Sequence, residues 1–227
     1  MLENQKRIKL KICFLIVFSL FLLVLSVLVN AQDQEQEQYT SLKDIIFQNS
    51  NLTDLQKEKC FVIAKKAIEI DLPKKDIEKI IKESLYMEAN SEDLEELIFL
   101  LIEAKSSGIP FLPLINKIKE GFLKGIDTKR VIEVIKIEKE KLSRAQSFLL
   151  TLNKKLGFED INKASEELVL FEDRGINPEE AQKILRIAAE KRLSFYEVKE
   201  GLETCLDFQE KGLPQTLIAR EVTKGFL

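Results

Sequence analysis

The sequence predicts an all-α fold of tandem helical hairpins, with solenoid-like units of about 37 residues and one long central helix. Three observations predict it. Turn signals recur at a regular spacing, and the apolar residues between them repeat with the period of an α-helix. Strand signals are nearly absent, because the sequence has no sustained alternation of apolar and polar residues and no Asn-Gly or Asp-Gly dipeptide.

Four turn markers divide the chain. Each joins a residue suited to end a helix to a nearby proline: Asp71 with Pro73, Gly108 with Pro110, Gly175 with Pro178, and Gly212 with Pro214. Glycine tolerates the left-handed backbone that ends a helix, and the fixed φ of proline suits the first turn of the next one. The first two markers lie 37 residues apart, and so do the last two. We therefore expect helices to end at these markers, with a positive φ at Gly108 and Gly212.

Polar caps predict a second helix start within each unit. Ser and Thr followed three residues later by Glu or Gln form a capping box, which Thr53 with Gln56 and Ser194 with Glu197 match. Further starts are expected at the caps Asn90, Asp127 and Asn177. Two helices of roughly 14 to 16 residues thus fill each unit.

One stretch departs from this spacing, since Gly108 and Gly175 are separated by 67 residues, less than two units. Apolar residues there keep a spacing of three and four without an interrupting Gly or Pro: Val131, Ile135, Leu142, Ala145, Leu149 and Leu152. The simplest account is one helix from about Thr128 to Lys155, about 42 Å long at 1.5 Å per residue. Gly121, inside the preceding helix, is expected to allow close helix packing.

Residues 1–31 have the features of a signal peptide. Four basic residues precede an uncharged apolar run over residues 12–29, and Val29 and Ala31 fit the small-residue rule for cleavage after Ala31. An uncleaved signal anchor is the alternative, because the run just reaches the length that spans a bilayer. Both interpretations place the rest of the chain outside the cytoplasm, in the periplasm or the extracellular space, with an inner-membrane anchor if the signal stays.

The remainder divides into a short leader and one domain. Residues 32–40, "QDQEQEQYT", are polar and acidic and predict a disordered leader, and residues 41–227 predict a single α-helical repeat domain. The full chain has a net charge of −3. Without residues 1–31 it holds 31 basic and 37 acidic residues, a net charge of −6. This balance does not indicate a nucleic-acid binder.

The composition restricts the available chemistry, because the chain has no histidine. Histidine is the commonest general base and a frequent metal ligand. The acidic runs "SEDLEEL" and "NPEEAQ" occupy the first turns of predicted helices, where negative charge complements the helix dipole. We therefore predict no catalytic, cofactor-binding or metal-binding residues.

Two cysteines lie on apolar helical faces. Cys60 belongs to the first predicted helix pair and Cys205 to the last. We expect buried free thiols that are not bonded to each other, because a disulfide needs Cα atoms within about 7 Å. A disulfide remains the alternative, since exported proteins often contain them.

Residues 108–144 form the cationic part of the chain, with nine basic and five acidic residues, whereas residues 32–107 have ten and seventeen. The candidate docking patch for an anionic partner comprises Lys117, Lys124, Lys129, Arg130, Lys136 and Arg144. The alternative is a solvated surface that acidic helices, such as the one expected from Ser91, already neutralise within the fold.

The stretch "GIPFLPLINKIKEGFLKGIDTKRV" resembles a phrase of uncharacterised exported bacterial α-helical repeat proteins. In that phrase Gly, an apolar residue and Pro precede a helix that ends in Glu-Gly and Lys-Gly, followed by a second helix. The resemblance implies helical-repeat architecture and bacterial export, and it brings no known activity or site residues. The unit at Gly175 departs from it, with "AAEKRLSF" in place of the glycine pairs.

These observations favour a non-catalytic binding module of the bacterial envelope, most simply for another protein of the envelope. No cofactor and no nucleic acid are expected, and the membrane is contacted only through residues 12–29 if they stay uncleaved. One alternative is a carboxylate-based hydrolase of cell-wall or polysaccharide material. Another is a membrane-tethered structural spacer.

Overall fold

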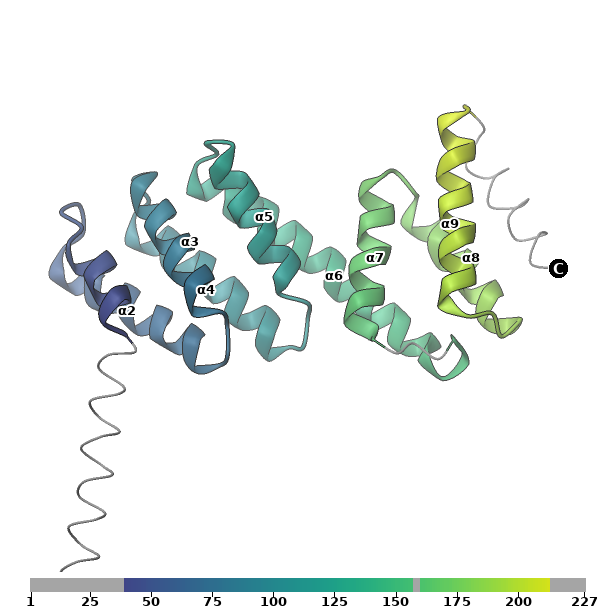
Figure 1. Ribbon diagram of the computed structural model, residues 1–227, viewed down its shortest axis with the longest axis horizontal. Coiled ribbons are helices and arrows are strands. Elements are labelled where there is room, and N and C mark those ends of the chain that lie inside the picture. Colours follow the sequence, from purple (N-terminus) through teal and green to yellow (C-terminus); the bar gives the residue numbers. More distant parts are fainter. Residues whose placement is uncertain (1–38, 157–159, 213–227) are drawn as a thin grey trace, which may run out of the picture. The chain divides into compact units, whose positions relative to one another are not determined.

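The computed structural model describes residues 39–156 and 160–212 (Figure 1). Within these ranges every regular element is an α-helix and none is a strand, so the predicted all-α class is confirmed. The chain divides into two compact units, Met1–Ser50 and Asn51–Leu227. The predicted domain boundary after residue 40 therefore falls ten residues before the boundary between the units.

In the first of these two compact units, Met1–Ser50, the described residues include one short helix over residues 39–47. Tyr39, Leu42 and Ile46 share a face of this helix and are buried. Its first two residues, Tyr39 and Thr40, were expected in the disordered leader, but both are helical and Tyr39 is buried on the same face as Leu42. The predicted signal peptide and residues 32–38 lie outside the described residues. Among the helices that are described, none is long and apolar enough to cross a bilayer.

The described residues of the second unit form eight helices. They are α2 (Asp54–Glu69), α3 (Lys74–Tyr86), α4 (Ser91–Ser106), α5 (Leu112–Leu123), α6 (Thr128–Leu156), α7 (Ile161–Asp173), α8 (Pro178–Glu190) and α9 (Phe195–Glu210).

Side chains cap these helices as predicted. Thr53 and Ser194 form complete capping boxes with Gln56 and Glu197 at the starts of α2 and α9. The Asn90 side chain accepts a hydrogen bond of 2.8 Å from the backbone N–H of Asp93. Each cap satisfies backbone N–H groups that have no partner within the helix.

The turn markers adopt the expected backbone. Gly108 has a φ of 71° and Gly212 a φ of 82°, both in the left-handed region that favours glycine. At the marker without glycine, Asp71 takes the same conformation with a φ of 62°. The markers therefore share a backbone geometry and not a residue type.

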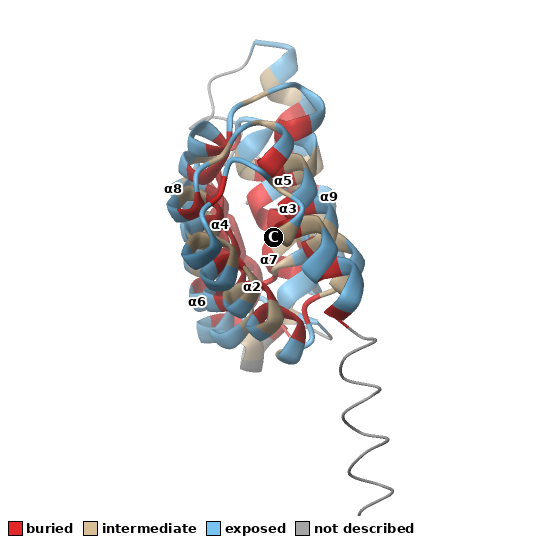
Figure 2. Cartoon of the chain, turned by 90° about the vertical axis from the view of Figure 1, so that its left-hand side faces the viewer, coloured by how far each residue is buried: buried red, intermediate tan, exposed pale blue. Residues whose placement is uncertain are grey.

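Helices two apart in sequence pack against each other. Contacts join α2 to α4, α4 to α6 and α6 to α8, while α3 contacts α5. In Figure 2 buried positions gather between the row containing α4, α6 and α8 and the row containing α3, α5 and α9. The starts of α2, α4 and α6 at Asp54, Ser91 and Thr128 are 37 positions apart each time.

Helix α6 is the long helix that the sequence predicts, with 29 residues. It contacts α4, α5, α7 and α8, so it connects the helices before it to those after it. The two preceding turns predict where a regular unit would end, because Pro73 and Pro110 are 37 residues apart and the next such position is Ser147. Serine there and Ala145 at the glycine position let α6 continue where earlier units turn.

Two glutamine side chains donate hydrogen bonds to turn carbonyls that lie far from them in the sequence. Nε2 of Gln146 in α6 donates to the carbonyl of Gly108 at 2.6 Å, and Nε2 of Gln209 in α9 donates to the carbonyl of Gly175 at 3.4 Å. In both cases the donor comes from the second helix after the turn. Gly108 and Gly175 lie directly after the C-caps of α4 and α7, so these bonds fix each turn against a later helix.

Both cysteines of the described residues are free thiols and buried, as predicted. Burial raises the pKa of Cys60 and of Cys205 to about 11, and nearby carboxylates add to both shifts, Glu95 and Glu92 at Cys60 and Glu180 at Cys205. Since the thiolate is the reactive form, both thiols are inert in the folded protein.

We expect a thiol reagent at neutral pH to leave Cys60 and Cys205 unmodified in the native protein and to label both in denaturant. Mass spectrometry of the peptides that contain each cysteine measures this separately from Cys13. Fast labelling of either peptide under native conditions would show that its helix opens locally.

Candidate functional site

The structure places the predicted docking patch on α5 and α6. Lys117 lies in α5 and Lys124 at its C-terminus, and the other four residues lie in α6. Five of the six have a carboxylate within 4.0 Å: Lys117 and Lys124 with Glu120 at 4.0 and 2.5 Å, Arg130 with Glu133 at 3.0 Å, Lys136 with Glu96 at 2.5 Å, and Arg144 with Glu172 at 2.7 Å. Lys129 is exposed and has no such partner within the described ranges.

Carboxylates from outside residues 108–144 therefore also pair with the cations of this patch. Glu96 belongs to α4 and Glu172 to α7, and packing brings both against α6. Lys139 and Lys141 likewise pair with Glu103 of α4 and Asp173 of α7. These cations hold α6 to its neighbours, as the alternative interpretation expected for part of the patch, and its docking role stays a prediction.

A shallow pocket of about 170 Å³ lies where α5 meets α6. Its apolar wall comes from Ile126, Val131 and Val134, and Lys117 and Lys124 stand at its polar side. Gly121 also lines it, and a Cβ on this glycine would lie 2.8 Å from Cγ2 of Val131. The predicted close packing at Gly121 is thus confirmed.

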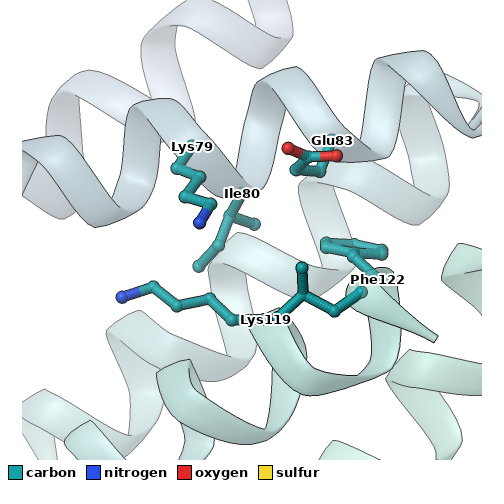
Figure 3. A pocket seen from close by; sticks show the side chains of 6 residues that line it. Lys79, Ile80, Glu83, Lys119 and Phe122 are labelled. Carbon is teal, nitrogen blue, oxygen red and sulfur yellow. The ribbon is translucent and has the colours of Figure 1, made fainter. Parts of the chain in front are cut away.

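A second, smaller cleft of about 50 Å³ lies between α3 and α5. It is lined by Lys79, Ile80 and Glu83 of α3 and by Lys119, Phe122 and Leu123 of α5. In Figure 3 the amines of Lys79 and Lys119 lie at one end, and the carboxylate of Glu83 lies above Phe122 at the other. The cleft therefore has a cationic end, an apolar floor and an anionic end.

A row of cations runs along α3 beside this cleft. Lys75, Lys79 and Lys82 are exposed and, within the described part of the chain, have no carboxylate at ion-pair distance. Tyr86, which follows Lys82 by four residues on the same helical face, is 81% exposed. Lys119 across the cleft is different, because its Nζ lies 2.5 Å from Asp76.

Sequence reasoning missed this row. Counting charges over residues 32–107 gave an acidic segment, which averaged the lysines of α3 with the glutamates of α4. The spacing could have shown it, since positions 75, 79, 82 and 86 are separated by four, three and four residues and so share one helical face.

A cluster of charged side chains joins α6 to α7. Burial raises the pKa of Glu138 and of Glu172 above the usual range, and Asp173 adds to both shifts. Lys141 lies 4.0 Å from Glu138, and Arg144 opposes the shift at Glu172. The Asp173 hydrogen bond raises the pKa of Lys141. Three carboxylates thus share two cations in a partly buried contact between helices.

The raised pKa of Glu138 predicts a pH dependence of stability. The folded state binds this proton more tightly than the unfolded state, so its contribution is fully present below the unfolded pKa and lost as pH rises through the folded one. Glu138→Gln should therefore gain stability relative to the wild type as pH rises from 4 to 7.

Urea unfolding of both proteins across this pH range measures the difference. The exposed Glu140→Gln on the same helix is the matched control for the loss of one carboxylate from α6. A gain for Glu138→Gln that shrinks as pH rises would contradict the assignment.

Across residues 39–156 and 160–212 there is no group of three or more Cys, Asp or Glu side chains that could hold a metal ion. No protein-family model matches the chain, and no curated protein matches it at a significant level of sequence similarity.

Proposed function

We propose that the protein is a non-catalytic binding module of the bacterial cell envelope that docks another protein. Its N-terminal segment would export it to the periplasm or the extracellular space, and its helical hairpins would stack as a solenoid-like array. Such arrays bury a core between neighbouring units and leave an extended surface available to a partner.

Three features support the array. Helices α2, α4 and α6 start 37 positions apart, and contacts join helices two apart in sequence. The glutamine bonds to the carbonyls of Gly108 and Gly175 repeat one stabilising contact in two different turns.

The observation that carries the binding function is the recurrence of exposed apolar side chains at equivalent positions of neighbouring helices. Tyr86 and Leu123 are 37 residues apart, end the contacting helices α3 and α5, and are 81% and 82% exposed. Val62 and Phe99 repeat this relation on the contacting helices α2 and α4. Single exposed apolar residues are normal, and the recurrence of such residues on contacting helices is what favours an interaction surface here.

Pocket size favours a protein partner over a small substrate. The pockets described above have volumes of about 50 and 170 Å³, below the roughly 300 to 1,000 Å³ of small-molecule sites. Two of the three described carboxylates with raised pKa values, Glu138 and Glu172, are held by Lys141 and Arg144 between α6 and α7, and the third, Glu166, has its pKa raised by burial and by Asp160 and Glu167.

Photo-crosslinking in the native host tests this function. A benzophenone amino acid at position 86, 99 or 123 should give one discrete adduct, while exposed positions 59 and 183 serve as controls. The protein identified should then bind the purified chain in solution. Equal adducts at all positions, or an absence of adducts from folded protein, would contradict the proposal.

The predicted cationic patch can be tested as a separate part of the docking surface. Reversing Lys136 or Arg144 would also break contacts of α6 with α4 and α7. Lys129→Glu leaves those pairs intact and should slow association with an anionic partner if the patch contributes. An unchanged association rate and salt dependence would assign the patch to helix packing alone.

A further inference from the structure

We propose that the cleft between α3 and α5 binds an acidic segment of the partner protein. One apolar side chain of that segment would enter the cleft, and its carboxylates would lie along Lys75, Lys79 and Lys82. The inference rests on the proposed binding function and adds the chemistry of the partner.

The row of lysines on α3 is the first reason to expect an anionic ligand. Like charges three and four residues apart destabilise a helix, and Lys75, Lys79 and Lys82 have no carboxylate within 4.0 Å in the described ranges, although Asp76, Glu78 and Glu83 lie three or four positions from them on α3. On α6, by contrast, four of the six cations whose side chains are described contact acids of α4 or α7. An anionic ligand would supply on α3 the compensation that packing supplies on α6.

The cleft beside this row is the reason to expect one apolar side chain in the ligand. Ile80 and Phe122 are buried at its floor, and Leu123 stands at its edge with 82% of its surface exposed. A buried water needs about 10 to 15 Å³ by the same measure, so about 50 Å³ holds several waters or the end of one apolar side chain. An exposed leucine beside such a space provides further apolar contact.

The two ends of the cleft set a direction for the bound segment. Lys79 lines the end where the Lys119 amine also lies, and Glu83 lies at the opposite end (Figure 3). Carboxylates of the ligand would lie toward Lys79, and backbone N–H groups or a cation toward Glu83. The carboxylate of Glu83 has no hydrogen-bonded or ion-pair partner within the described ranges, so it is available for this contact.

An acidic protein segment fits these features better than an anionic membrane. A lipid surface is flat and uniformly negative, so Glu83 beside the lysine row would oppose it, whereas a single chain can place a donor there.

Selection from a phage-displayed library of random twelve-residue peptides on the full chain tests the inference. Enriched peptides should combine several acidic residues with one large apolar residue. A fluorescent synthetic peptide of the enriched sequence then gives the dissociation constant by anisotropy. Enrichment of peptides without acidic residues would overturn the inference.

Variants then locate the site on α3. The triple change Lys75→Glu, Lys79→Glu and Lys82→Glu should weaken binding about tenfold or more. The matched control, Lys59→Glu, Lys66→Glu and Lys183→Glu, alters exposed lysines of α2 and α8, makes the same change in net charge, and should leave the affinity within about twofold. Circular dichroism checks that both triple variants keep their helix content.

Two single changes test the polarity of the cleft. Glu83→Gln should weaken binding of the acidic peptide by less than the α3 triple variant does, because it removes the charge that meets an N–H group or cation of the segment, and Leu123→Ser should weaken it without changing the melting temperature. Equal weakening by both triple variants, or tighter binding after Glu83→Gln, would overturn the site.

Two outcomes separate this inference from the function on which it rests. If a crosslinked partner binds the α3 triple variant as tightly as wild type, the binding function stands and the acidic-segment site is wrong. If phosphatidylcholine and phosphatidylglycerol vesicles bind through the α3 lysines while no acidic peptide does, the site belongs to a membrane and the inference is wrong.

Discussion

Replacing Ser147 with proline should lower the free energy of unfolding by about 3 kcal/mol. Ser147 is exposed in the interior of α6, so the substitution removes no buried side-chain contact. The loss would come from the backbone, because proline cannot donate the helical hydrogen bond and its ring clashes with the preceding turn. Urea denaturation measures the change, and Ser147→Ala should stay within about 0.5 kcal/mol of wild type.

Position 147 makes this substitution informative about the fold. It follows Pro73 and Pro110 at the same spacing of 37, so proline would restore the residue found where two earlier units turn. If α6 could turn there, the new proline would be tolerated at little cost. A loss below about 1 kcal/mol would therefore show that α6 acts as two helices rather than as one brace.

The long helix was predictable because its signals are local. Regular apolar spacing and the absence of Gly and Pro between residues 128 and 155 are properties of neighbouring positions. The caps at Thr53 and Ser194 and the left-handed turn at Gly108 are local in the same sense. Each depends on a few residues whose backbone preferences do not require knowledge of the partner helices.

The charge arrangement was not predictable in the same way. Lys136 pairs with Glu96, which precedes it by 40 residues, and Arg144 pairs with Glu172, which follows it by 28. A net charge summed over a segment cannot show which helices become neighbours. It therefore overstated the free positive charge of α6 and concealed the unpaired lysines of α3.

Gly121 is a position where the sequence suggested close packing and the structure identifies the partner. It is buried in α5, and a Cβ there would lie 2.8 Å from Cγ2 of Val131 in α6. Real Cβ atoms do not approach that closely, and Val131 is itself buried and restricted at χ1, so it cannot easily turn away. The tight α5–α6 turn therefore depends on the missing side chain.

Gly121→Ala should destabilise the protein by about 1 to 2 kcal/mol. Strain from overpacking costs about 1 to 3 kcal/mol, while the better helix propensity of alanine returns only about 0.5 to 1 kcal/mol. Asn116→Ala on the exposed face of α5 is the control for propensity alone and should be neutral or slightly stabilising.

Replacing Val131 with alanine as well should reverse the sign of the stability change that Gly121→Ala causes. Val131→Ala alone should cost about 2 kcal/mol, because it removes buried methyl groups and leaves a space beside Gly121. In that background the new Cβ of Gly121→Ala fills the space and keeps its helix propensity, so it should stabilise by about 0.5 to 1 kcal/mol. A double-mutant cycle from four urea curves then gives a coupling of about 2 kcal/mol between two positions in direct contact. Additive effects would show that the two helices move apart to accept the alanine, and the close approach of α5 to α6 would not be a constraint on the fold.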